Sequence, residues 1–236
     1  MALGRLGLGE SIQLRATRAA KYKVQFTMSS MLSEFDMIDI ISANRTTELK
    51  NALQSGLLDV NAVTDDVVGT TLLMMACNLN RTELVKILLN NKADIGKGNC
   101  DNDIALHCAS YMSSSKIIRL LIFNDLKTIN FKNIIGQTPL MVAAKRCYPR
   151  AVELLLNAGA NRKMVDYRGS TALHWCFTER HRIANVNATL KLLCHNEDEF
   201  DIQNNSGDTP RDYLISFQRR YPEYALTIPY PGHKST

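Results

Sequence analysis

A short motif returns along this chain at a nearly constant interval. In its most regular copy, residues 136–143, it reads Gly-Gln-Thr-Pro-Leu-Met-Val-Ala, and the intervals between copies are 33, 34, 33 and 38 residues. The copies begin at Gly69, Asn102, Gly136, Gly169 and Gly207. Such a period predicts one small unit stacked repeatedly, because a single unit of this size cannot bury its apolar side alone.

The second half of each interval repeats as well. Residues 83–89, 116–122 and 150–156 are apolar segments with the spacing of a buried helix. Together with the Gly-x-Thr-Pro-Leu motif they make the chain resemble the ankyrin repeat, whose unit is a β-turn followed by two antiparallel helices. The resemblance covers residues 31–221 and implies an all-α solenoid of helix-turn-helix units connected by β-turns or hairpins.

The period divides the solenoid into five full units and a half unit. Lys50 stands where later units carry Val85, Ile118 and Val152, which predicts a solvent-facing N-terminal cap. Pro222 falls where the second helix of the last unit should begin and would break it. The predicted units are 31–65, 66–98, 99–132, 133–165 and 166–203, followed by the half unit 204–221.

Threonine before the first helix gives most units a helix start, since its hydroxyl can accept a hydrogen bond from a free backbone N–H. The predicted capping residues are Thr71, Thr138, Thr171 and Thr209. The third unit has Ile104-Ala105 instead of Thr-Pro and is expected to be the least stable. Thr and Pro there should stabilise it, provided that Ile104 is not a core contact. The fifth unit has five extra residues within 178–187, which lengthen the loop between its helices.

The two ends differ in composition from the repeats. Residues 1–30 hold five basic side chains and one acidic one, and the interpretations are a disordered leader, a start upstream of a true one at Met28 or Met31, or a mitochondrial presequence. Residues 222–236 carry three prolines and are predicted to form an extended tail. We expect residues 31–221 to fold without the leader.

No motif predicts catalysis or a cofactor. The sequence lacks a Gly-rich phosphate loop, a Gly-x-Ser-x-Gly elbow and a His-Glu-x-x-His segment, so we predict no enzyme and no catalytic or cofactor-binding residue. The His and Cys residues that could be imagined as zinc ligands are His107, Cys108, His174, Cys176, Cys194 and His195. Without a Cys-x-x-Cys pair, however, core packing is favoured and no metal is predicted. Cys147 beside Arg146 is a weaker hypothesis for a reactive thiol.

The sequence also predicts a compartment. Six widely spaced cysteines without a secretory signal indicate reduced thiols, and no apolar run has the roughly 18 residues needed to span a membrane. We therefore expect a soluble, monomeric, cytoplasmic protein, with a nuclear or mitochondrial location as alternatives.

In proteins that this chain resembles, the turn tips and the ends of the first helices line a groove that holds another protein. Apolar residues at turn tips are unusual and indicate a contact patch; the alternative is that the tips pack against one another and the nearby charges are a solvated face. The predicted partner-binding residues are Val67, Val68, Leu79, Tyr111, Met112, Ile134, Ile135, Lys145, Arg146, Tyr167 and Arg168.

The charge of +5 is concentrated near this groove. Residues 145–182 hold eight basic and three acidic side chains. We therefore predict an adaptor or scaffold whose partner protein has an apolar and acidic segment. A nucleic-acid-associated factor that uses the basic half is the alternative, although the chain has no recognition helix and few aromatic residues for base stacking.

Overall fold

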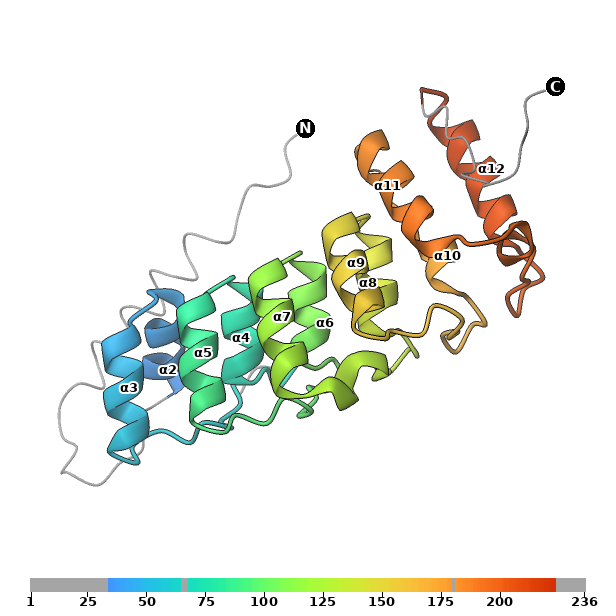
Figure 1. Cartoon of the computed structure of the whole chain (residues 1–236). Coiled ribbons are helices and arrows are strands. Elements are labelled where there is room, and N and C mark those ends of the chain that lie inside the picture. The colour runs from blue at the N-terminus through green and yellow to red at the C-terminus, as the bar shows by residue number, and fades with distance from the viewer. Residues whose placement is uncertain (1–33, 65–67, 180, 224–236) are drawn as a thin grey trace, which may run out of the picture.

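A computed structural model describes residues 34–64, 68–179 and 181–223. The predicted leader, the predicted start of the first unit at Met31 and the tail from residue 224 lie outside these ranges. The helices stand in two rows (Figure 1). The row of first helices is α2 (Glu34–Ser42), α4 (Leu72–Asn78), α6 (Ala105–Tyr111), α8 (Pro139–Lys145), α10 (Ala172–Trp175) and α12 (Pro210–Arg220). The row of second helices is α3 (Thr46–Gln54), α5 (Thr82–Asn90), α7 (Ser115–Asn124), α9 (Pro149–Asn157) and α11 (Ile183–Leu193).

Each helix packs on the next member of its own row and on its partner in the same unit, so the core is continuous from end to end. The same register position supplies this core in four units, with Leu88, Leu121, Leu155 and Leu193 all buried. The connections hold two short 3₁₀ helices, η1 (Leu126–Asn130) and η2 (Glu197–Phe200). The predicted all-α solenoid of helix-turn-helix units is confirmed.

The two ends of the solenoid are finished differently. Lys50 on α3 is exposed, as expected of a polar cap, while its neighbour Leu49 is buried. At the other end α12 stops at Arg220, two residues before Pro222, and residues 221–223 form no further helix. A half unit therefore closes the described part of the chain.

The threonines predicted to cap the first helices stand at the N-cap positions. The hydroxyl oxygens of Thr71, Thr138 and Thr209 accept hydrogen bonds from backbone N–H groups three residues later, at 3.2 to 3.4 Å. Thr171 differs, because its hydroxyl lies 3.0 Å from Nδ1 of His174. These contacts supply partners for N–H groups that a helix start otherwise leaves unpaired.

The third unit corrects one expectation. Ile104 has the extended backbone of an N-cap, with φ −105° and ψ 170°, but its side chain is fully buried. The condition for a stabilising threonine there is therefore not met. Ile104→Thr adds a cap of about 1 kcal/mol but buries a hydroxyl in place of a well-packed ethyl group, at about 2 kcal/mol.

We expect Ala105→Pro alone to stabilise the protein by about 0.5–1 kcal/mol, because the extended Ile104 tolerates a following proline and the first helical position needs no N–H. Ile104→Thr should instead lower stability by about 1 kcal/mol, as the difference of the two contributions above. Urea unfolding of the two single variants measures both. If both substitutions stabilise the protein, the buried Ile104 side chain contributes less to stability than its burial indicates.

Two buried histidines tie neighbouring units together. Nδ1 of His107 accepts the backbone N–H of Ile104 at 3.3 Å, and its Nε2 lies 3.0 Å from the carbonyl oxygen of Gln137 in the next unit. His174 repeats the arrangement with Thr171 at 3.0 Å and Asp208 at 3.2 Å. Both rings are therefore neutral, with the proton on Nε2. These residues have structural roles.

Burial lowers the pKa of both His107 and His174, against a smaller upward effect of the carbonyl oxygens they contact. The unfolded chain thus binds protons that the folded protein does not bind once the pH falls below about 6.5. We expect the free energy of unfolding to fall as the pH drops from there, since a protonated Nδ1 cannot accept the backbone N–H.

Melting curves at about pH 7.5 and pH 5.5 measure this loss. In the double variant His107→Gln and His174→Gln, a glutamine at the third helical position can still reach back to the N-cap N–H but does not titrate. The variant should lose less melting temperature on acidification than the unchanged protein. Equal losses would assign the acid sensitivity to other groups.

Candidate partner-binding groove

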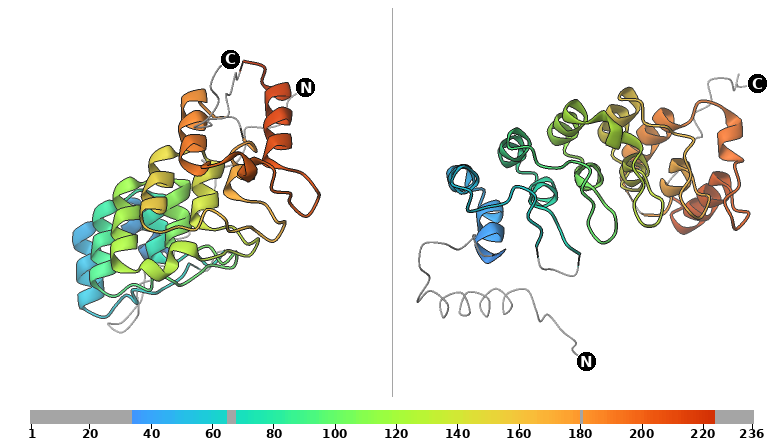
Figure 2. Two further views of the ribbon diagram at one scale, coloured as in Figure 1. Left: turned by 45° about the vertical axis from the view of Figure 1, so that its right-hand side comes forward. Right: turned by 90° about the horizontal axis from the view of Figure 1, so that it is seen from below.

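In the third to sixth units, the turn before the first helix is built around one Asn or Asp side chain. The Oδ1 atom of Asn133 accepts the N–H groups of Ile135 and Gln137, and Asn99, Asp166 and Asn204 make the same two contacts in their units. These turns project to one side of the helices (Figure 2, right). These Asn and Asp side chains thus fix the backbone conformation of the tips.

Backbone hydrogen bonds join successive tips into a ladder. Ile134 N–H donates to the carbonyl oxygen of Asp101 at 2.7 Å, and Tyr167 N–H donates to that of Ile135 at 3.1 Å. Cys100 is joined to Val68 and Asn205 to Arg168 in the same way, both at 2.8 Å. The tips therefore contact one another through the main chain, which leaves their side chains directed away from the ladder.

The predicted partner-binding residues mostly lie on the surface. Val67 lies outside the described residues, and Arg168 is exposed. Exposed fractions between 38% and 64% are found for Val68, Leu79, Tyr111, Met112, Ile134, Ile135 and Tyr167. So many large apolar side chains exposed along one set of turns and helix ends make this side of the solenoid a candidate contact surface.

Part of this surface is hollowed between the tips and the first helices of the second to fourth units. The hollow has a volume of about 330 Å³ and brings together three of the predicted residues, Val68, Tyr111 and Lys145. Its other lining residues include Met74, Asn78, Asn99, Asp103, His107, Gln137 and Val142. We call it the central pocket.

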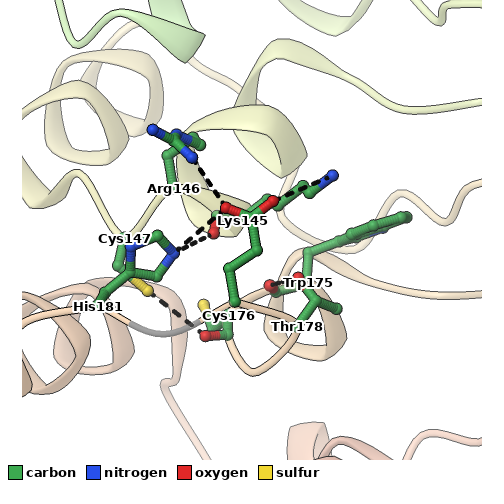
Figure 3. A network of polar contacts seen from close by, with 8 residues as sticks. Lys145, Arg146, Cys147, Trp175, Cys176, Thr178 and His181 are labelled. Atoms are coloured by element: carbon green, nitrogen blue, oxygen red, sulfur yellow. Dashed lines mark hydrogen bonds and ion pairs between the residues drawn. The ribbon is translucent and has the colours of Figure 1, made fainter. Parts of the chain in front are cut away.

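Two of the three predicted basic residues, Lys145 and Arg146, are not free charges. Arg146 Nη1 lies 2.9 Å and Lys145 Nζ 3.4 Å from the carboxylate of Glu179 (Figure 3). Arg146 also stacks on the ring of Tyr111, with 4.6 Å from Cζ to the ring centroid, and Lys145 lies over Trp175 at 5.4 Å. Glu179 therefore offsets one of the two positive charges that Lys145 and Arg146 bring to the groove.

The insertion in the fifth unit produces this arrangement. Glu179 and His181 belong to the loop between α10 and α11, and His181 Nε2 lies 2.8 Å from the carbonyl oxygen of Lys145. The sequence located the insertion but gave no sign that it folds back on the fourth unit. Gln137 and Asp103 were also missed, although both precede a first helix by one or two residues in a register that the motif defines.

The thiols of Cys147 and Cys108 are poorly placed to react. Cys147 adopts the positive φ of 47° that a glycine position requires, but its side chain is fully buried and its Sγ–H donates to the carbonyl oxygen of Cys176 at 3.4 Å. The hypothesis of a reactive Cys147 is therefore not supported. Burial, helped by the nearby charge of Asp103, raises the pKa of Cys108 in the central pocket to about 12, so this thiol stays protonated at neutral pH.

Among the described residues, no group of three or more His, Cys, Asp or Glu side chains is placed to hold a metal ion. None of the described helices has the length and apolar character that crossing a membrane requires.

Stacked helix pairs with a ladder of turns and a grooved surface define a helical-repeat protein of the class that binds other macromolecules along an extended surface. The model of the family described as ankyrin repeats (3 copies) matches residues 37–133 and 124–204. The chain belongs to the ankyrin-repeat family. The repeats of this family are non-enzymatic modules that bind other proteins.

Curated relatives include notch proteins. The chain is 32% identical over 145 residues to neurogenic locus notch homolog protein 1 of Xenopus tropicalis, covering 61% of this chain and 6% of that protein. It is 30% identical over 177 residues to neurogenic locus notch homolog protein 2 of Homo sapiens, covering 75% of this chain and 7% of that protein. The chain thus spans a small fraction of the length of these relatives.

Proposed function

We propose that this protein is a non-enzymatic adaptor or scaffold that holds a segment of a partner protein along its tips and first-helix ends. The observation that carries this proposal is the row of large apolar side chains exposed at those positions. The backbones of the tips are already fixed by the ladder and those of the other residues by the helices, so binding would order few additional residues and lose little conformational entropy.

The partner would be apolar where it meets Ile134 and Ile135, and acidic where it meets Arg168. Arg168 supports the acidic part because it is exposed and forms no ion pair within the described ranges. Lys145 and Arg146 contribute less than the sequence suggested, because Glu179 offsets them. The six free cysteines suit a reducing compartment such as the cytoplasm, where we place the monomeric protein.

Substitution of exposed residues at the groove tests the proposal. In the double variant Leu79→Ser and Met112→Ser, two side chains that are 41% and 43% exposed at the ends of α4 and α6 become polar. The control is Phe123→Ser on α7, where an aromatic side chain is 89% exposed away from the tips and first-helix ends. An affinity pulldown with each protein compares the recovered partner.

We expect the double variant to lose at least about tenfold in affinity for that partner, since apolar residues central to an interface dominate its binding energy. Phe123→Ser should bind normally, and all three proteins should melt alike. Loss of binding with Phe123→Ser but not with the double variant would place the partner on the second helices.

A further inference from the structure

This inference rests on the proposed function and concerns the chemistry of the partner. We infer that the central pocket receives one cationic side chain, lysine or arginine, from an extended partner segment, with Asp103 as its counter-ion. The sequence pointed only to the basic half of the groove, whereas this site lies in its other half.

The first observation is an uncompensated negative charge. Asp103 lines the pocket, and Asp101 stands exposed on the tip of the same turn. Neither carboxylate has an ion-pair partner among the residues of known placement. Among the described residues that line the pocket, Lys145 is the one cation, and it is held by Glu179 and Trp175. The charge of Asp103 is therefore available to a ligand.

The second observation is independent of charge. Gln137 also lines the pocket, its side chain is 94% buried, with 6% exposed, and its Nε2 atom has no hydrogen-bond partner in the described part of the chain. A buried amide group without a hydrogen-bond partner lowers the stability of the fold. A ligand that accepts a hydrogen bond from Gln137 would explain why the protein keeps this group. Rotation about the last side-chain bond can turn either its nitrogen or its oxygen toward the pocket.

Asn133 links these two residues. Its Nδ2 donates to Asp103 Oδ1 at 3.0 Å, and its Oδ1 accepts the backbone N–H of Gln137 at 2.8 Å. This contact fixes the Asp103 carboxylate while leaving its second oxygen uncommitted. A rigid acceptor beside an unpaired amide is a site that is organised before the ligand arrives.

The lining of the central pocket determines which kind of partner side chain fits it. Val68, Met74, Tyr111 and Val142 make the sides apolar, while Asp103 and Gln137 are polar. A lysine or arginine side chain matches this pattern, because its methylene stem packs on apolar surface and its charged end seeks a carboxylate. The backbone carbonyl group of the same partner residue can accept the N–H of Gln137.

Selection from a library of random dodecapeptides displayed on phage, with the folded chain as bait, tests the inference. The recovered peptides should share Lys or Arg at one fixed position. Synthetic peptides are then titrated by fluorescence anisotropy against the unchanged protein and Asp103→Asn, which removes the charge but keeps an oxygen for Asn133. Asp198→Asn removes a charge from η2 and serves as the matched control.

We expect Asp103→Asn to weaken binding about tenfold, and Asp198→Asn to leave it unchanged. Replacing the shared Lys or Arg of the peptide by Met should cost as much on the unchanged protein, and nothing further on Asp103→Asn. The peptide substitution is independent of how well the protein variant folds.

Gln137→Met gives a second readout. It keeps the length of the side chain and removes the unpaired amide, so we expect binding to weaken about threefold while the melting temperature stays the same or rises by about 2 °C. A purely structural glutamine would instead lose melting temperature on this change.

The remaining outcomes overturn the inference in distinguishable ways. Peptides that share no cation, yet lose binding to Leu79→Ser and Met112→Ser, would leave the proposed function standing and refute the cationic anchor. Peptides that bind regardless of the groove substitutions, or no selected peptides at all, would refute both.

Discussion

Gly136→Ala is expected to lower the free energy of unfolding by about 3 kcal/mol, whereas Gly159→Ala in the same unit should cost only about 1 kcal/mol. Both glycines have positive φ, 83° and 91°, a conformation that costs any residue with a Cβ. At Gly136 the added Cβ would also lie 2.6 Å from the backbone nitrogen of Tyr167, while nothing lies within 4 Å of it at Gly159. The comparison therefore isolates the close approach of two turns.

The clash at Gly136 involves backbone, which cannot swing aside as a flexible side chain can. Tyr167 N–H donates to Ile135 at this point, so the methyl group would push apart the rung of the ladder between the fourth and fifth units. Urea unfolding measures the stability loss, and hydrogen exchange of the Tyr167 amide reports the rung directly. An equal loss of unfolding free energy in the two variants would mean that the neighbouring turns move apart without destabilising the protein.

The repeat explains why so much of the fold was predictable. Each Gly-x-Thr-Pro copy fixes a turn and a helix start locally, and the constant period then dictates the stacking. The stabilisation expected from Thr-Pro at residues 104 and 105 depended on whether Ile104 is a core contact, because a sequence shows which cap is missing but not whether the residue in its place is buried. Packing against neighbouring units decided that position.

The candidate site was less predictable than the fold for a related reason. Register alone placed Tyr111, Ile134 and Ile135 at exposed positions, because those positions follow from the period. The charge balance does not follow from it. Glu179 reaches Arg146 only because the insertion folds back, and a single sequence carries no signal for the path of an irregular loop.

Because the ladder is made by backbone groups, side chains at the tips can be changed to test binding without removing the bonds that stabilise the tips. Ile134 and Ile135 are 58% and 49% exposed, and the hydrogen bonds that hold them are made by their backbones. A change of side chain there keeps those bonds. Arg146 is different, since glutamate at this position would face Glu179 and disturb the fold, so Arg168 is the better residue for testing charge.

The double variant Ile134→Ser and Ile135→Ser should lower affinity for a partner recovered by pulldown by more than about tenfold, because exposed apolar anchors near the centre of an interface carry much of its binding energy. Stability should change by no more than about 0.5 kcal/mol.

Arg168→Glu should mainly slow association and weaken its dependence on salt, since a charge at the rim steers the encounter more than it holds the complex. Kinetic binding measurements at two salt concentrations, with melting curves of each protein, distinguish these effects. Unchanged affinity in both variants would place the binding site elsewhere, and a melting loss of several degrees for the isoleucine pair would show that these side chains stabilise the solenoid itself.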